Sequence, residues 1–170
     1  MADRKAFQIV AVSVAVLLVL SVTLWFVYVG AAGGDTDETI AFTHGGEVFF
    51  EAGLDYIKGF ESVTFETVIR SSVLKPTKVE YTGVRLLDLL NDMNVDLNGK
   101  KSIIVKGSDG YMTGVSFEEL NKKDIYIAYE MDGKPLKPRE KNGYGPYQLV
   151  IPGDPYSQRW CKYIYEVEVE

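Results

Sequence analysis

The longest hydrophobic run of the chain lies near its N-terminus. From Ala6 to Gly34, 29 consecutive residues contain no Asp, Glu, Lys or Arg, and only four polar residues interrupt the apolar segment Phe7–Val29. A helix of about 20 residues crosses the hydrocarbon core of a bilayer, and its backbone groups bond to one another there instead of to water. The pattern therefore predicts a transmembrane helix over 7–29.

The charges on either side of this segment predict its orientation. Arg4 and Lys5 precede it, whereas residues 35–38 carry three acidic side chains. Because basic flanking residues stay on the cytoplasmic side of a membrane, we expect residues 1–6 in the cytoplasm and the C-terminal domain outside it. The chain is then a single-pass protein of the cell membrane, with the lipid bilayer as its first partner through Phe7–Val29.

A cleaved signal peptide is the alternative interpretation of the same segment. Val29-Gly30-Ala31 and Gly30-Ala31-Ala32 both have the small-residue pattern that signal peptidase accepts. The apolar region of such signals is usually about 7–15 residues long, which is shorter than this one. Both alternatives export the remaining chain, and they differ in whether residues 1–31 are kept.

After a linker over 30–47, we expect one domain over 48–170, and its hydrophobic pattern is mainly that of short strands. Runs rich in β-branched and aromatic residues, several of them alternating with polar ones, are typical of half-buried strands. The last run ends in a strict alternation over 165–170, which indicates one face on the core and one in water. The predicted strands are Val48–Phe50, Val63–Ile69, Lys78–Tyr81, Ser102–Val105, Ile125–Tyr129, Gln148–Ile151 and Lys162–Val169.

Helical signals are fewer than strand signals. Leu86, Leu89, Leu90 and Met93 recur at spacings of three, four and seven residues, which predicts an amphipathic helix over Val84–Met93.

Two local signals complete the picture. Ser116 and Glu119 form the sequence pattern of a capping box, which opens a short helix, and Asp132-Gly133 predicts a hairpin turn. Strands interspersed with a few short helices indicate an α+β fold.

Composition excludes several functions. The chain of 170 residues has a net charge of −6, one cysteine and one histidine. An acidic protein lacks the basic face that displaces counterions from nucleic acid, so we expect no nucleic-acid partner. One cysteine excludes an internal disulfide, and one cysteine with one histidine excludes a zinc finger. A Ser-His-Asp or Cys-His site could use only His44.

Five segments of the predicted domain resemble, in order, the sulfite-oxidase-type molybdopterin-binding domain. Each segment alone is a weak signal, and their order and spacing make the resemblance specific. It extends over roughly Val48 to Val169. It implies a sulfite-oxidase-like molybdopterin-binding fold of mixed β-sheets with short helices, here preceded by one transmembrane helix. The segments are Tyr81-Thr82-Gly83-Val84-Arg85-Leu86-Leu87-Asp88-Leu89-Leu90, Val105-Lys106-Gly107-Ser108-Asp109-Gly110-Tyr111, Ile127-Ala128-Tyr129-Glu130-Met131-Asp132-Gly133-Lys134-Pro135-Leu136, Gly145-Pro146-Tyr147-Gln148-Leu149-Val150-Ile151-Pro152-Gly153 and Arg159-Trp160-Cys161-Lys162-Tyr163-Ile164.

The resemblance also implies a cofactor. Full members of the family are oxidoreductases that hold molybdenum through a pterin dithiolene and one protein cysteine, because a soft thiolate completes a sulfur-rich coordination. In this chain the corresponding stretch, 68–76, contains no cysteine. Ser71 or Ser72 could offer an oxygen ligand there, and the alternative is that both are ordinary loop serines. We therefore assign no metal ligand, and molybdopterin is a cofactor that the resemblance alone suggests.

Two further residues depart from the family pattern. Cys161 occupies a position where the family has an apolar residue, within a strand-like run, and a lone cysteine there is usually a small buried hydrophobic residue. The alternative is a reactive or ligating thiol. Gln148 stands where the family has an arginine that helps to surround the cofactor or substrate.

Two basic residues keep the family pattern. Arg159 and Lys162 match the positions that hold the pterin phosphate, and two cations three residues apart can bind a phosphate group. The alternative is that both are solvated charges that balance Glu166 and Glu168. The positions that correspond to the family's cofactor site, whether they keep or change the family residue, predict a pocket. Its residues are Arg70, Ser71, Ser72, Tyr111, Tyr147, Gln148, Arg159 and Lys162.

The export signal bears on whether a cofactor is loaded. The resemblance implies that members carrying molybdopterin fold around it in the cytoplasm and leave by the twin-arginine route. Here Asp3-Arg4-Lys5-Ala6-Phe7 has lysine in place of the second arginine. We therefore expect the chain to leave by general secretion, which exports unfolded chains. The domain would then fold outside the cytoplasm without cofactor.

Two functions follow from these observations. The first is a membrane-anchored, extracytoplasmic ligand-binding or accessory module of this family that lacks the molybdenum-ligating cysteine. Its partner would be a small anionic ligand or another membrane protein. The second is an active molybdopterin-dependent oxidoreductase with non-cysteine metal ligation.

Overall fold

The computed structural model describes residues 39–71, 75–96 and 99–170. They belong to a compact unit that extends over Asp37–Glu170. The predicted transmembrane segment 7–29 lies outside the described residues. Among the residues that are described, no helix is long and apolar enough to cross a membrane.

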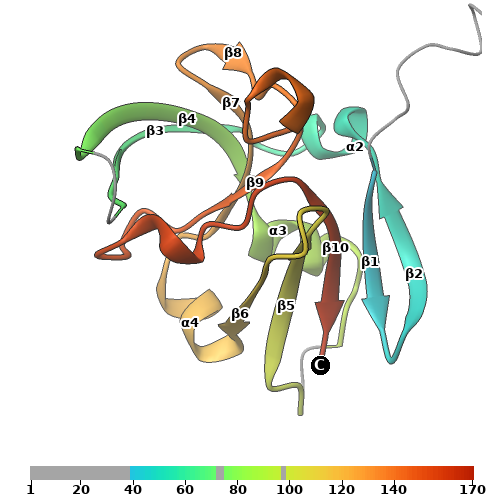
Figure 1. The fold of residues 1–170 in the computed structure, drawn as a ribbon. Helices are drawn as coiled ribbons and strands as arrows, with labels where there is room; N and C mark the ends of the chain where they lie inside the picture. The colour runs from blue at the N-terminus through green and yellow to red at the C-terminus, as the bar shows by residue number, and fades with distance from the viewer. Residues whose placement is uncertain (1–38, 72–74, 97–98) are drawn as a thin grey trace, which may run out of the picture. The chain divides into compact units, whose positions relative to one another are not determined.

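The first of two five-stranded sheets contains both ends of the domain (Figure 1). Its strand order is β2-β1-β10-β5-β6. The parallel pair of β1 with β10 lies near its middle, and the other pairs are antiparallel. The strands are β1 (Ile40–His44), β2 (Glu47–Ala52), β5 (Ser102–Gly107), β6 (Met112–Ser116) and β10 (Ile164–Val169).

The second sheet is built on a long curved hairpin, and all its pairs are antiparallel. Its order is β3-β4-β7-β8, with β9 also paired to β7. The strands are β3 (Val63–Ile69), β4 (Thr77–Arg85), β7 (Tyr126–Met131), β8 (Lys134–Pro135) and β9 (Gln148–Val150).

The helices among the described residues connect the strands and are short. Figure 1 places α3 and α4 near the ends of the strands that they connect. The α-helices are α2 (Leu54–Lys58), α3 (Leu86–Asp92) and α4 (Phe117–Lys122), and the 3-10 helices are η1 (Arg139–Lys141) and η2 (Ser157–Arg159). Mixed sheets with short helices confirm the predicted α+β class.

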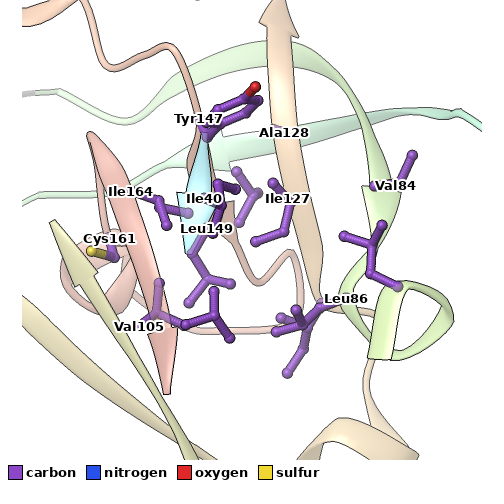
Figure 2. Packing of buried hydrophobic residues seen from close by; sticks show 14 of the residues in the cluster. Ile40, Val84, Leu86, Val105, Ile127, Ala128, Tyr147, Leu149, Cys161 and Ile164 are labelled. Atoms are coloured by element: carbon purple, nitrogen blue, oxygen red, sulfur yellow. The ribbon is translucent and has the colours of Figure 1, made fainter. Parts of the chain in front are cut away.

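The core draws on both sheets. Ile40 of β1, Val105 of β5, Ile127 of β7 and Leu149 of β9 are fully buried in one cluster, to which α3 adds Leu86 (Figure 2). Each fully buried side chain of this size stabilises the fold by about 1.5–3 kcal/mol relative to an exposed one. The two sheets therefore fold as one unit around a shared interior.

The N-terminal boundary of the domain differs from the prediction. The predicted linker 30–47 contains β1, whose Ile40 and Phe42 are fully buried. This strand pairs with β10, its parallel neighbour more than 120 residues later in the chain. Five residues give too little alternation to stand out locally, and the remote partner supplies the missing pairing. The domain therefore begins before residue 48.

The predicted elements within the domain are largely confirmed. β3 has the predicted bounds, and the Asp132-Gly133 turn joins β7 to β8 with φ angles of 52° and 68°, as a type I′ turn requires. The helix predicted over Val84–Met93 begins instead at Leu86, because Val84 pairs with Ile127 as part of β4.

Candidate functional site

The segment from Ser157 to Lys162 brings most of the predicted pocket residues together; we call it the 157–162 segment. Ser157 exchanges hydrogen bonds with the backbone of Arg70, from Arg70 N to Ser157 Oγ (2.8 Å) and from Ser157 N to Arg70 O (3.0 Å). The Tyr111 hydroxyl donates to Gln158 O at 2.6 Å. At the other end of the segment, Lys162 forms a β-bridge with Gln148. Loops that are distant in the sequence therefore meet on these six residues.

Arg159, in the middle of the segment, binds two carboxylates. Its Nε donates to Asp154 Oδ2 at 2.8 Å and its Nη2 to Glu119 Oε1 at 2.5 Å. Lys123 Nζ adds a second cation, 2.8 Å from Glu119 Oε1 and 3.0 Å from Asp154 Oδ1. The Asp154 side chain is only 5% exposed. We call these four residues the salt-bridge network.

The network shifts the acidities of its members. Hydrogen bonds from Arg159 hold the pKa of Glu119 below its usual value, against the opposing effect of burial. Burial would raise the pKa of Asp154, but hydrogen bonds from Arg159 and Lys123 outweigh it and lower that pKa. Both carboxylates are therefore ionised and neutralise the guanidinium of Arg159.

This pairing bears on both interpretations of Arg159. The guanidinium is already bound by anionic groups of the protein, so a phosphate would have to compete with them. It also does not balance Glu166 and Glu168. Those two carboxylates of β10 bind Lys106 of β5, at 3.0 and 2.8 Å.

Lys162 has a different environment. Its Nζ lies 4.0 Å from the centroid of the Tyr144 ring, a cation–π contact. Among the described residues, it forms no ion pair within 4.0 Å. Burial lowers the pKa of its amine, and the charge of Asp109 partly opposes this shift. The half-buried ammonium of Lys162 is therefore better placed than Arg159 to attract an anion.

Gln148 and Tyr147 are core residues rather than pocket walls. The Tyr81 hydroxyl donates to Gln148 Oε1 at 3.0 Å, and both side chains are buried. Burial raises the pKa of Tyr81, so its hydroxyl stays protonated. Tyr147 is 1% exposed within the same core (Figure 2). Neither residue offers a free polar group to a ligand.

The thiol of Cys161 lies at the edge of the core. Its sulfur lies 3.9 Å from Tyr111 O. Cys161 belongs to the same buried cluster as Val105 and Ile164 (Figure 2), and the residue is 0% exposed. Burial raises the pKa of the thiol to about 12, with a smaller effect from the charge of Asp109. The expectation of a small buried hydrophobic residue is confirmed.

The remaining predicted residues lie on the surface or outside the described residues. The side chains of Arg70, Ser71 and Tyr111 are exposed, and Ser72 lies outside the described residues. Arg70 enters the site through its backbone, as described above. The predicted pocket residues therefore lie where several loops contact the 157–162 segment. Among them, Lys162 and Tyr111 have side chains that a ligand could reach.

Sequence reasoning missed the carboxylates that bind Arg159. The capping-box pattern did point to Glu119, whose backbone N–H donates to Ser116 Oγ at 3.1 Å. Its carboxylate, however, accepts from Arg159 and Lys123. Asp154 directly follows Gly153, the last residue of the fourth segment that resembles the family, and no pattern in the sequence indicated it.

Comparison with known proteins agrees with this fold. Residues 58–170 match the model of the oxidoreductase molybdopterin-binding domain family. Among solved structures, the sulfane dehydrogenase SoxCD from Paracoccus pantotrophus has a similar fold, with a TM-score of 0.63 and 18% identity over 77% of this chain. The match extends over only 37% of the SoxCD chain. No curated protein sequence matches. The family model, which matches well over half of the residues, shows that the chain belongs to the oxidoreductase molybdopterin-binding domain family.

Proposed function

We propose that this chain is a membrane-anchored, extracytoplasmic member of the family that acts as a ligand-binding or accessory module rather than as a molybdenum enzyme. The observation that carries the proposal is the state of its one cysteine. A metal is bound by the thiolate form, whereas Cys161 is fully buried and its pKa is raised to about 12. The stretch 68–76, where the resemblance places the ligand, has no cysteine.

The residues at the pterin phosphate position also fit the cofactor poorly. Phosphate recognition by arginine depends on a guanidinium whose donors are free to bind in a bidentate manner. Arg159 donates instead to Glu119 and Asp154. Lys162 is the remaining cation of the pair, and one ammonium supports a weaker and less specific anion site than two.

The ligand that we expect at this site is a small anion. Lys162 supplies a half-buried positive charge. The exposed Tyr111 contacts the same 157–162 segment, because its hydroxyl donates a hydrogen bond to Gln158 O. The other end of this segment is bound to the loop that contains Arg70, because Ser157 is hydrogen-bonded to that loop. The 157–162 segment thus connects the anion site at Lys162 to the loops of Tyr111 and Arg70, which suits an accessory role toward a partner protein.

The second candidate function is an oxidoreductase with non-cysteine ligation. Ser71 is exposed next to Arg70, whose backbone is bound to the 157–162 segment, and it belongs to the stretch 68–76 where the resemblance places the ligand. The chemistry of molybdopterin would supply the redox step. This chain would then contribute an oxygen donor from Ser71 or Ser72.

Elemental analysis separates the two functions. The full chain is purified from its own membranes beside a cysteine-ligated family member prepared in the same way, and molybdenum and released pterin phosphate are measured in both. We expect less than 0.1 equivalent of either in this chain and close to one in the control. A stoichiometric amount of both in this chain would overturn the module and support the enzyme.

Anchoring and orientation are tested on intact cells. We expect the chain to resist extraction by alkaline carbonate and its domain to be cut by added protease without cell lysis. The intact mass of the purified protein distinguishes an anchor from a cleaved signal, because removal of residues 1–31 shortens it. A chain that is extracted by carbonate, or protected from protease, would contradict the proposed location.

A further inference from the structure

A second concave surface lies between the β7–β8 hairpin and the loop after η1. This hollow has a volume of about 330 Å³. Three lysines line it, Lys134, Lys137 and Lys141, together with Asn142 and the ring of Tyr144. We call it the lysine hollow. Its size is within the range of small-molecule sites, about 300–1,000 Å³.

The charge of the lysine hollow is opposite to that of the chain. The chain has a net charge of −6, yet residues 134–141 contain four basic side chains and one acidic side chain. Among the described residues, none of the three lysines forms a salt bridge, whereas Lys106, Lys123 and Arg159 each bind two carboxylates. Unneutralised cations that converge on one concave surface raise the local concentration of anions.

The one carboxylate that lines the hollow, Asp132, is hydrogen-bonded within the second sheet. Asp132 Oδ1 accepts a hydrogen bond from Glu80 N at 3.0 Å, and Asp132 N donates to Glu80 O at 2.8 Å. These bonds tie the turn to β4. The lining of the hollow therefore contains three lysines and one carboxylate, which is already hydrogen-bonded.

Backbone contacts fix the spacing of the lysines. Gly145 N donates to Lys137 O at 2.8 Å and Gly143 N to Pro138 O at 3.1 Å. A Cβ at Gly143 would lie 1.9 Å from Lys137 O, so only glycine allows this approach. The segment with Lys141 is thereby held against the one with Lys137. Only the side chains have to be ordered when a ligand binds, which lowers the entropic cost.

We infer that the lysine hollow binds a small multivalent anion of the phosphate class. Lysine ammonium groups bind phosphate as point charges, and three of them favour a ligand with more than one negative charge over chloride. Lys162 Nζ lies 4.0 Å from the centroid of the Tyr144 ring, which lines the hollow, and this ammonium adds positive potential at the margin of the hollow. This inference goes beyond the proposed function and does not depend on whether the domain holds molybdenum.

Calorimetric titration of the full chain in neutral detergent micelles tests the site. Two probes distinguish a free phosphate compound from a lipid headgroup: pyrophosphate, and dihexanoylphosphatidylglycerol below its micelle concentration. The test variant carries Lys134→Gln, Lys137→Gln and Lys141→Gln. The matched control carries Lys78→Gln, Lys101→Gln and Lys122→Gln, which remove the same charge from exposed lysines elsewhere.

We expect one probe to bind with 1:1 stoichiometry in 50 mM salt, and at least tenfold more weakly to the test variant than to the control. The probe that binds identifies the source of the phosphate. Absence of binding by both probes, or an equal loss in test and control variants, would overturn the inference. So would a loss confined to Lys162→Gln, because the anion would then occupy the site of the proposed function instead.

Discussion

Tyr81 and Gln148 form a buried polar pair, in which the tyrosine hydroxyl donates to the glutamine Oε1 at 3.0 Å. The pair links β4 to β9 inside the second sheet. Gln148 stands where the resemblance expects an arginine, and the residue is 2% exposed. A neutral partner for Tyr81 thus takes the place of a charge that would need a counterion or a bound anion.

The pair is expected to contribute to stability as a unit. Tyr81→Phe leaves a buried acceptor without its donor, so the free energy of unfolding should fall by about 1–2 kcal/mol. Tyr81→Phe with Gln148→Leu should cost less than the sum of the single changes, with a coupling of about 1 kcal/mol in a double-mutant cycle of urea unfolding. Tyr165→Phe, at an exposed position of β10, is the control with a change below about 0.5 kcal/mol. Additive costs would show that the pair is not coupled.

The salt-bridge network is expected to hold the 157–162 segment in place. Arg159→Gln leaves the buried carboxylate of Asp154 with Lys123 alone, so we expect a loss of about 2 kcal/mol, discounted from fully buried pairs because Arg159 is partly exposed. Lys122→Gln breaks an exposed pair with Glu118 and should cost less than about 0.5 kcal/mol. Urea unfolding measures both. Equal effects of the two variants would contradict a structural role of the network.

Stability should fall in acid because of the same carboxylates. The pKa values of Glu119 and Asp154 are lowered in the folded chain, so folding favours their ionised forms. Their contribution is complete above the unfolded values of about 4 and is lost as the pH falls through the lower folded values. The free energy of unfolding, measured from pH 6 down to pH 2.5, should decrease below about pH 4. Glu119→Gln should make this decrease shallower, and an unchanged slope would contradict the assignment.

The fold was predictable where the signal is local. The alternation over 63–69 and the Asp132-Gly133 turn depend on neighbouring residues, and both are confirmed. β1 was missed because its parallel partner is β10. The start of α3 was misplaced because tertiary pairing with Ile127 keeps Val84 in the strand.

The site was predictable in its positions but not in its contacts. Motif order located Arg159, Lys162 and Gln148. Their partners depend on packing between loops: Glu119 is 40 residues from Arg159 in the sequence, and Tyr144 meets Lys162 only once the η1 loop is folded. A pattern of residue types contains no information on which of several nearby carboxylates a guanidinium binds.

The thiol of Cys161 should be almost inert in the folded chain. With a pKa of about 12, its thiolate fraction at pH 8 is at least about a thousandfold below that of an ordinary cysteine. Iodoacetamide should therefore label the native chain about a thousandfold more slowly than the urea-unfolded chain. A Cys161→Ala variant with Tyr156→Cys, at a position that is 60% exposed, is the reactive control. Rapid native labelling of Cys161 would reopen its role as a ligand.

Gly83, in the first of the five segments that resemble the family, should be irreplaceable for a steric reason. It lies at a register shift between β4 and β7, where an added Cβ would be 2.5 Å from Ile127 O and 2.7 Å from Ala128 Cα. Both are backbone atoms, so Gly83→Ala must separate the two strands, and we expect a loss of about 3 kcal/mol or more. Gly114→Ala in β6 meets only the end of Ile104 at 3.5 Å and should change stability by less than about 0.5 kcal/mol. Urea unfolding compares the two, and a Gly83→Ala chain as stable as Gly114→Ala would contradict the close approach of β4 and β7.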